Sequence, residues 1–247
     1  MELWADQGIV LSARPHGDGG AVVALLTEKN GRHAGFVHGA YSSKKRALLE
    51  PGSFVKAQWQ ARVADHLGHY SLEAEAGLPV GILEDPLKLS ALLSACSLCD
   101  AALPEREGHP GLFHGMSELL GAFEEEYWGA VYVMWEIALL KELGFRLELN
   151  KCAAKGDATT LTHVSPKSGR AVSAKEAKPY QDKLLELPNF LRPTPLRNDN
   201  AGDHQDIYRG LIMTGHFLEH WVFNHHSKGV PEARLRLQER FQKKWAD

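Results

Sequence analysis

The period of the hydrophobic pattern changes once along this chain, near residue 86. In "FVKAQWQARV" (54–63), apolar residues alternate with Lys, Gln and Arg, which is typical of a half-buried β-strand. In "DPLKLSALLSACSLCDAALPE" (85–105), apolar residues recur at helical spacing after an acidic residue and a proline, which favour a helix start. We therefore predict an α+β chain, with β-structure first and helices after it.

The first 76 residues predict five short strands. Two of them lie in "GAVVALLTEKNGRHAGFVHGAY" (20–41), joined at Asn30-Gly31, a strong hairpin signal because both residue types tolerate positive φ. The others are "QGIVLSARPHG" (7–17), the alternating segment above and "HLGHYSLEAEA" (66–76). Five short strands are consistent with a small barrel, and the oligonucleotide-binding (OB) barrel is the leading candidate.

The remaining chain predicts helices around a central apolar one. "AVYVMWEIALLKELGF" (130–145) is apolar almost all round and is expected to be buried; it contains Glu136 and Lys141 and is shorter than the ~20 residues of a membrane span. Further helices are expected at 85–105, 115–129 and 203–226, and a small irregular excursion at 150–181. We predict an OB-fold domain at 1–80 and a helical domain at 81–247 that contains this excursion.

Composition favours a soluble cytoplasmic protein without a membrane partner. The N-terminus does not read as a secretory signal, and three cysteines do not suggest a disulfide framework. The net charge of −3 is unevenly distributed. Residues 1–80 have 8 basic and 8 acidic side chains, 81–150 have 4 and 12, and 151–247 have 16 and 11. Such a chain can carry a basic face for a polyanion despite its acidic total.

Motifs for catalysis are weak, and we expect no catalytic residue, no metal and no cofactor. Cys96 and Cys99 form a CxxC inside an apolar helical segment, where two buried core residues are the simpler interpretation. "HFLEH" (216–220) matches the H-x-x-E-H pattern of some zinc proteases. A zinc hydrolase is therefore a distant alternative, because no third ligand is evident and a five-letter match is easily met in a chain with 13 His.

The best functional lead is the basic triplet Lys44, Lys45 and Arg46, which lies between two predicted strands. Cationic side chains on a barrel loop can follow a phosphate backbone, and nearby aromatic side chains can stack bases. A solvated loop is the alternative interpretation. The candidate DNA-binding residues are Arg14, Arg32, Lys44, Lys45, Arg46, Lys56, Arg62 and Arg170.

Taken nearly end to end, the chain resembles the RecO family of bacterial DNA-repair mediators. The segments that carry the resemblance are "GIVLSARPHGDGGAVVALLTEKNGRHAGFVHGA", "LEPGSFVKAQWQAR", "LLKELGFRLELNKC" (139–152), "VSPKSGRAVS" (164–173) and "LPNFLR" (187–192). The most specific is the buried helix that closes in Leu-Gly-Phe and is followed by Cys152.

The resemblance implies an OB barrel followed by a helical domain that binds single- and double-stranded DNA and anneals complementary strands. It implies joint action with RecR to load RecA onto DNA coated by single-stranded DNA-binding protein, whose acidic C-terminal tail the family also docks. The alternative is an adaptor without annealing activity, in which the basic helical half captures an acidic partner peptide.

Some relatives in this family carry a four-cysteine zinc module after the buried helix. Here Cys152 matches the first cysteine, whereas Lys155, Ser173 and Glu176 stand at the other three positions. One thiolate cannot make the closed tetrahedral site that zinc prefers. The resemblance and this departure together predict a zinc-finger-like excursion that keeps its shape without metal.

Overall fold

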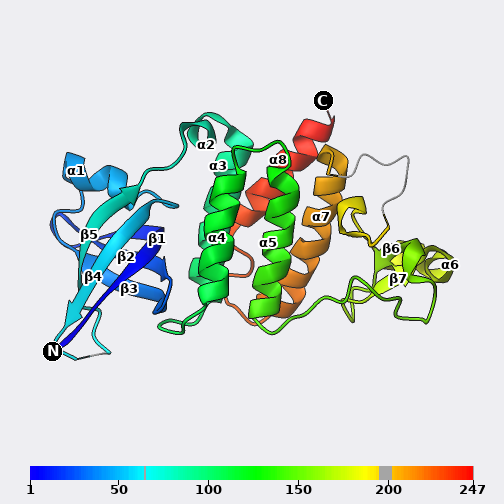
Figure 1. The fold of residues 1–247 in the computed structure, drawn as a ribbon, viewed down its shortest axis with the longest axis horizontal. Helices are drawn as coiled ribbons and strands as arrows, with labels where there is room; N and C mark the ends of the chain where they lie inside the picture. Colours follow the sequence, from blue (N-terminus) through cyan, green and yellow to red (C-terminus); the bar gives the residue numbers. More distant parts are fainter. Residues whose placement is uncertain (64, 195–201, 247) are drawn as a thin grey trace. The chain divides into compact units, whose positions relative to one another are not determined.

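The computed structural model describes residues 1–63, 65–194 and 202–246 (Figure 1). Its internal contacts define two compact units. The first comprises Met1–Glu124 and Pro231–Arg234, and the second comprises Glu125–Val230 and Leu235–Asp247. The predicted domain boundary at residue 80 stays a prediction.

The first unit contains a closed five-stranded barrel with the strand order β1-β2-β3-β5-β4, as predicted (Figure 1). Neighbouring strands are antiparallel except β3 and β5, which close the barrel in parallel through Phe36 and His69. The strands are β1 (Glu2–His16), β2 (Gly20–Thr27), β3 (Gly31–Val37), β4 (Phe54–Ala61) and β5 (His69–Ala76). The chain is thus an α+β protein with an OB-like barrel.

The barrel interior follows the alternation in the sequence. In β4, Val55, Ala57, Trp59 and Ala61 are buried, whereas the residues between them are exposed. At one end, the rings of Trp4, His33, Trp59 and Tyr70 pack together at centroid separations of 4.8–6.0 Å. The Nδ1 atom of His33 and the hydroxyl of Tyr70 are 3.0 Å apart, so these two polar atoms are paired inside the barrel.

His33 gives barrel stability a pH dependence. Burial, and then the positive charge of Arg106, lower the pKa of His33 from 6.5 to about 4. The unfolded chain therefore takes up a proton on His33 as pH falls below 6.5, while the folded barrel does not until about pH 4. We expect this group to remove on the order of 2–3 kcal/mol of stability across that window, and nothing further below it.

Urea unfolding at pH 7.5, 6 and 4.5 checks this expectation. His33→Gln keeps a polar partner for Tyr70 but does not titrate. In this variant, the free energy of unfolding should therefore fall less between pH 7.5 and 4.5, by the contribution expected of His33. Burial also lowers the pKa values of His163 and His216, which remain in the variant. These two groups account for the pH dependence of unfolding free energy that the variant keeps. An identical pH profile in both proteins would contradict the assignment.

Helices complete the first unit. The basic triplet, predicted as loop, is a helical turn, α1 (Ser43–Arg46), followed by the 3-10 turn η1 (Ala47–Leu49). α2 (Val80–Glu84), α3 (Pro86–Ala102) and α4 (Pro110–Ala122) follow the barrel, and α3 packs against β1. The side chain of Asp85 caps α3 by accepting hydrogen bonds from the backbone of Leu87 and Lys88, as its sequence predicts. Cys96 and Cys99 are buried in α3, which confirms their interpretation as core residues.

The second unit is built around α5 (Trp128–Glu142) and α7 (His204–Phe217), which pack together. Glu136, on the apolar central helix, is fully buried. Its carboxylate accepts hydrogen bonds from the hydroxyls of Tyr132, at 3.0 Å, and Thr214. The π-helical segment η5 (Leu218–Val222) extends α7, and α8 (Glu232–Ala246) brings Phe241 onto the ring of His204, with centroids 4.6 Å apart.

The predicted excursion forms a small sheet with the strand order β7-β6-β8. Its elements are η2 (Ala158–Thr160), β6 (Leu161–Val164), β7 (Ala171–Ser173), α6 (Ala174–Ala177), η3 (Lys178–Lys183), β8 (Leu185–Glu186) and η4 (Asn189–Leu191). Across the residues that the structure describes, no helix has the length and apolar character needed to cross a membrane.

Candidate nucleic-acid interface

The basic triplet is held beside β3 by the side chain of Lys45. The Nζ atom of Lys45 donates a 2.6 Å hydrogen bond to the carbonyl oxygen of His38, just after β3. Arg46 is exposed and lines a hollow of about 820 Å3 whose other walls include Tyr41, Leu83 and Leu93. The backbone of α1 therefore presents Arg46 to solvent at one end of the barrel, next to an apolar surface.

Two predicted DNA-binding arginines, Arg14 and Arg32, already have a partner within the protein. Nη2 of Arg14 lies 2.7 Å from Oδ2 of Asp100, and Nε of Arg32 lies 3.2 Å from Oδ1 of the same carboxylate. Asp100 also accepts a 2.9 Å hydrogen bond from the hydroxyl of Ser12. The side chain of Arg14 remains 73% exposed, whereas that of Arg32 is 22% exposed. Arg14 can therefore reach a ligand without leaving Asp100, and Arg32 chiefly ties β3 to α3.

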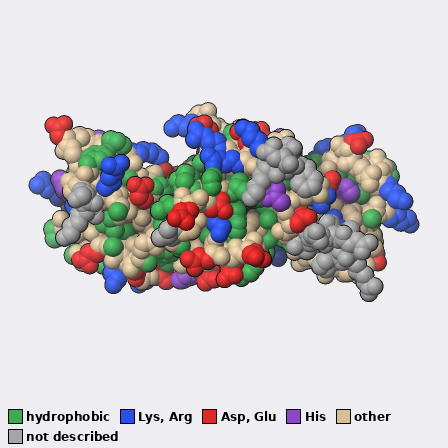
Figure 2. Space-filling model, turned by 90° about the horizontal axis from the view of Figure 1, so that it is seen from above, with side chains coloured by type: hydrophobic (Ala, Val, Ile, Leu, Met, Phe, Trp, Pro, Cys, Tyr) green, Lys and Arg blue, Asp and Glu red, His purple; other side chains and the backbone are tan. Residues whose placement is uncertain are grey.

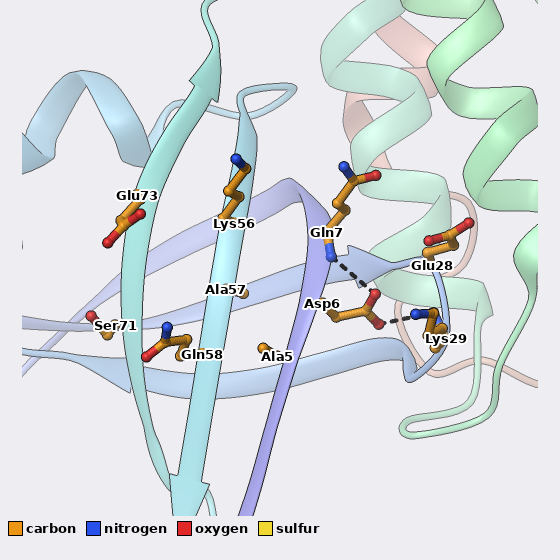
Figure 3. A pocket seen from close by; sticks show the side chains of 10 residues that line it. All are labelled: Ala5, Asp6, Gln7, Glu28, Lys29, Lys56, Ala57, Gln58, Ser71 and Glu73. Carbon is orange, nitrogen blue, oxygen red and sulfur yellow. Dashed lines mark hydrogen bonds between the residues drawn. The ribbon is translucent and has the colours of Figure 1, made fainter.

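Lys56 lies in an unfavourable setting for a polyanion. It lines a hollow of about 490 Å3 on the outer side of β1, β4 and β5 (Figure 3). The hollow also contains Lys29 and three acids, Asp6, Glu28 and Glu73, and Glu73 is the cross-strand neighbour of Lys56. The carboxylate of Asp6 accepts hydrogen bonds from the backbone of Gln7 and Lys29 (Figure 3). Acids outnumber bases here, so DNA contact by Lys56 receives no support from its surroundings.

Arg62 is in a more suitable position. It is exposed just after β4 and lines a hollow of about 430 Å3 together with His66 and His69.

Arg170, in contrast, belongs to the second unit, where its Nε lies 3.1 Å from a carboxylate oxygen of Glu148. The structure thus divides the predicted residues among several surfaces. On the face drawn in Figure 2, the Lys and Arg side chains of the barrel are interspersed with hydrophobic, uncharged and acidic surface.

The structure also brings His16 and His69 to Phe36 and His38, whose rings lie just upstream of the basic triplet in the sequence. The rings of His16, Phe36, His38 and His69 form a connected cluster on the outside of the barrel. Strand alternation places Phe36 and His38 on the same side of β3, but His69 joins them only because β3 and β5 pair in parallel. That pairing spans more than thirty residues and has no local sequence signal.

The residues at the four zinc-ligand positions do not fit a metal. Cys152 and Ser173 are adjacent, and the backbone N–H of Ser173 donates to Sγ at 3.3 Å. Burial acts to raise the pKa of the Cys152 thiol, but hydrogen bonds from Ser173, Ala154 and Gly156 outweigh it and hold the pKa below its usual value. A Cβ at Gly156 would lie 2.2 Å from Oγ of Ser173. The turn around Cys152 is therefore held by backbone hydrogen-bond donors, by close packing and by a single thiol. Within this turn, Lys155 has a left-handed backbone conformation (φ 61°).

The "HFLEH" segment does not form a metal centre with neighbouring side chains. The rings of His216 and His220 stack with centroids 4.1 Å apart, and Nδ1 of His220 lies 2.9 Å from the carbonyl oxygen of His216. Within the described part of the chain, no group of three or more His, Cys, Asp or Glu could hold a metal ion. The two stacked histidines therefore lie side by side where α7 continues into η5.

Comparison with known proteins identifies the chain. The family model Recombination protein O N terminal matches residues 1–75, and Recombination protein O C terminal matches residues 83–229. The chain is 49% identical over 242 residues to the DNA repair protein RecO of Rhodospirillum centenum, which covers 97% of this chain and 95% of the relative. It is 46% identical over 238 residues to that of Caulobacter vibrioides (strain NA1000 / CB15N), with 96% of each chain covered. A third relative, the DNA repair protein RecO of Rhodospirillum rubrum, is 42% identical over 252 residues, covering 100% of this chain and 98% of the relative.

The barrel, the helices that follow it and these matches define a DNA repair protein. More narrowly, the chain belongs to the RecO family, whose members are recombination mediators and not enzymes. The resemblance read from the sequence is confirmed, and the zinc hydrolase alternative is set aside.

Proposed function

We propose that this protein binds single- and double-stranded DNA and anneals complementary strands as a recombination mediator. In this role it acts with RecR to load RecA onto DNA coated by single-stranded DNA-binding protein, whose acidic tail it docks. The observation that carries the DNA-binding step is the helical turn α1, which presents Lys45 and Arg46 at one end of an OB-like barrel. Family membership supports the roles of the partners.

Charge neutralisation explains how the barrel could promote annealing. Two DNA strands repel each other, and each cationic side chain that contacts a phosphate releases a condensed counterion and lowers that repulsion. α1 is a single short turn and its Arg46 side chain is exposed, so this cation can follow a flexible DNA backbone. Arg62, just after β4, and the exposed guanidinium of Arg14, on β1, add further exposed cations to the same barrel.

Replacing Lys44, Lys45 and Arg46 with alanine should weaken binding to a labelled single-stranded oligonucleotide about tenfold or more at low salt. Each lost phosphate contact lowers the slope of log K against log salt by ~0.7 on single strands, so the slope should flatten by about 2. Fluorescence anisotropy at several salt concentrations measures both quantities.

A matched control removes the same charge elsewhere. Lys175, Lys178 and Lys183 are exposed on the small-sheet module, and their triple alanine variant should keep the salt slope of the parent. Equal losses in the two triple variants would show a diffuse charge effect and would contradict the role of α1. If the parent binds DNA but does not anneal complementary strands, the adaptor alternative, with a basic helical half that captures an acidic peptide, replaces the annealing proposal.

A further inference from the structure

The aromatic cluster on the outside of the barrel is built from the ends of three strands and the residue after one of them. His16 ends β1, Phe36 lies near the end of β3, His38 follows β3, and His69 begins β5. The rings of His38 and His69 are stacked, with centroids 5.0 Å apart and an interplanar angle of 18°. The ring of Phe36 meets both edge-on, at 4.7 Å and 5.9 Å.

The backbone fixes this cluster in place. The N–H of Phe36 donates to the carbonyl oxygen of Gly68 at 3.0 Å, which closes the barrel directly beneath the rings. The ring of Phe36 covers Gly20 so closely that a Cβ there would lie 2.1 Å from its Cζ atom. Because Phe36 is packed against the barrel and half-buried, while all three histidines are exposed, the imidazoles form the outer layer of an ordered aromatic surface.

Cationic groups border this surface on two sides. The carbonyl oxygen of His38 accepts the hydrogen bond from Lys45 of α1, so the basic turn and the stacked pair are joined. His69 also lines the hollow that contains Arg62. In the strand register, Arg14 pairs with Val22 and Val22 pairs with Phe36, so Arg14 lies on the same row across the barrel. One acidic residue, Asp18, lies two positions after His16, in the turn between β1 and β2.

We propose that His38 and His69, backed by Phe36, form a stacking platform for an unpaired base, with Lys45 and Arg62 as cations for the adjoining phosphates. An aromatic surface next to cations is the arrangement by which proteins bind single strands without reading their sequence. The bases of a duplex are already stacked on one another, so this platform favours single-stranded over double-stranded DNA. The inference rests on the proposed DNA binding. It adds a base-dependent contribution to the binding free energy that salt does not screen.

The test compares two oligonucleotides that have the same number of phosphates. One is a labelled oligo(dT), and the other is the same backbone with abasic residues. The parent protein should bind oligo(dT) about tenfold more tightly than the abasic strand, because one stacked base contributes that order of affinity. In His38→Ala/His69→Ala the ratio should fall severalfold, and the affinity for the abasic strand should change little.

Two further variants separate stacking from charge and from misfolding. His38→Phe/His69→Phe keeps aromatic rings but cannot carry charge, so it should retain the preference for bases. His225→Ala/His226→Ala removes two exposed histidines from the second unit and should behave as the parent does. Circular dichroism melting shows whether each variant is folded.

The outcomes are distinguishable. A parent that binds neither strand refutes the proposed DNA binding itself. A parent that binds both strands equally, with a steep salt dependence, leaves DNA binding intact and overturns the platform. A base preference that persists unchanged in the double alanine variant places the stacking surface elsewhere and also overturns the inference.

Discussion

Gly31→Ala should strongly destabilise the first unit. Gly31 begins β3 with φ +63°, and a Cβ at this position would lie 1.6 Å from the carbonyl oxygen of Glu107. That atom belongs to backbone, which cannot rotate away as a side chain can. We expect a loss of more than about 4 kcal/mol, against a typical domain stability of roughly 5–15 kcal/mol. Thermal and urea unfolding followed by circular dichroism measure the change.

Gly39→Ala is the matched control for this substitution. Gly39 has nearly the same backbone conformation, with φ +60°, but a Cβ there would meet nothing within 4 Å. It should therefore cost only the left-handed strain of a non-glycine residue, about 1–2 kcal/mol. Similar losses at the two positions would mean that backbone strain alone matters and that the close approach of Glu107 does not.

The same glycine shows what local sequence can and cannot predict. Asn30-Gly31 correctly predicted the hairpin between β2 and β3, because turn chemistry depends on the φ angles of a few consecutive residues. The alternation in 54–63 correctly predicted which side of β4 is buried, because strand geometry has a period of two. The contact between Gly31 and Glu107 could not be predicted, because it joins segments that are distant along the chain.

The candidate site follows the same division. The sequence located the basic triplet, although it predicted a loop where the chain forms the helical turn α1. It could not show that Lys56 lies among Asp6, Glu28 and Glu73, or that His38 and His69 stack. Both facts depend on how the strands are ordered around the barrel. Charge counts identify residues capable of binding a polyanion, whereas the pairing of each charge is set by tertiary structure.

Asp100 is the clearest example of a charge pairing that only the tertiary structure shows. Its removal is expected to lower stability and to raise DNA affinity. Its side chain is 9% exposed and is contacted by Ser12, Arg14 and Arg32, which link β1 and β3 to α3. Asp100→Ala leaves two guanidinium groups without their carboxylate, so we expect a loss of about 2–4 kcal/mol in urea unfolding. The hydrogen bond from Arg32 to the backbone oxygen of residue 100 can persist in the variant and limits the loss.

The same substitution frees positive charge on the barrel surface. With no carboxylate beside it, the exposed guanidinium of Arg14 can neutralise a phosphate, and the salt slope for single-stranded DNA should steepen by up to ~0.7 for this one charge. Affinity at low salt should rise severalfold, measured by anisotropy at a temperature where the variant is folded. Glu105→Ala is the control, because its carboxylate lies 3.9 Å from Arg32 and is 44% exposed, so its removal should change stability by less than about 1 kcal/mol.

The two readouts of Asp100→Ala together decide what Arg14 does. Lower stability with higher DNA affinity would mean that Asp100 holds the barrel to α3 at the expense of charge available to DNA. Lower stability with unchanged affinity and slope would mean that Arg14 lies outside the DNA path, so the basic surface would be confined to α1 and Arg62. Unchanged stability would contradict the structural role of the carboxylate, because a nearly buried group with three polar partners cannot be removed without cost.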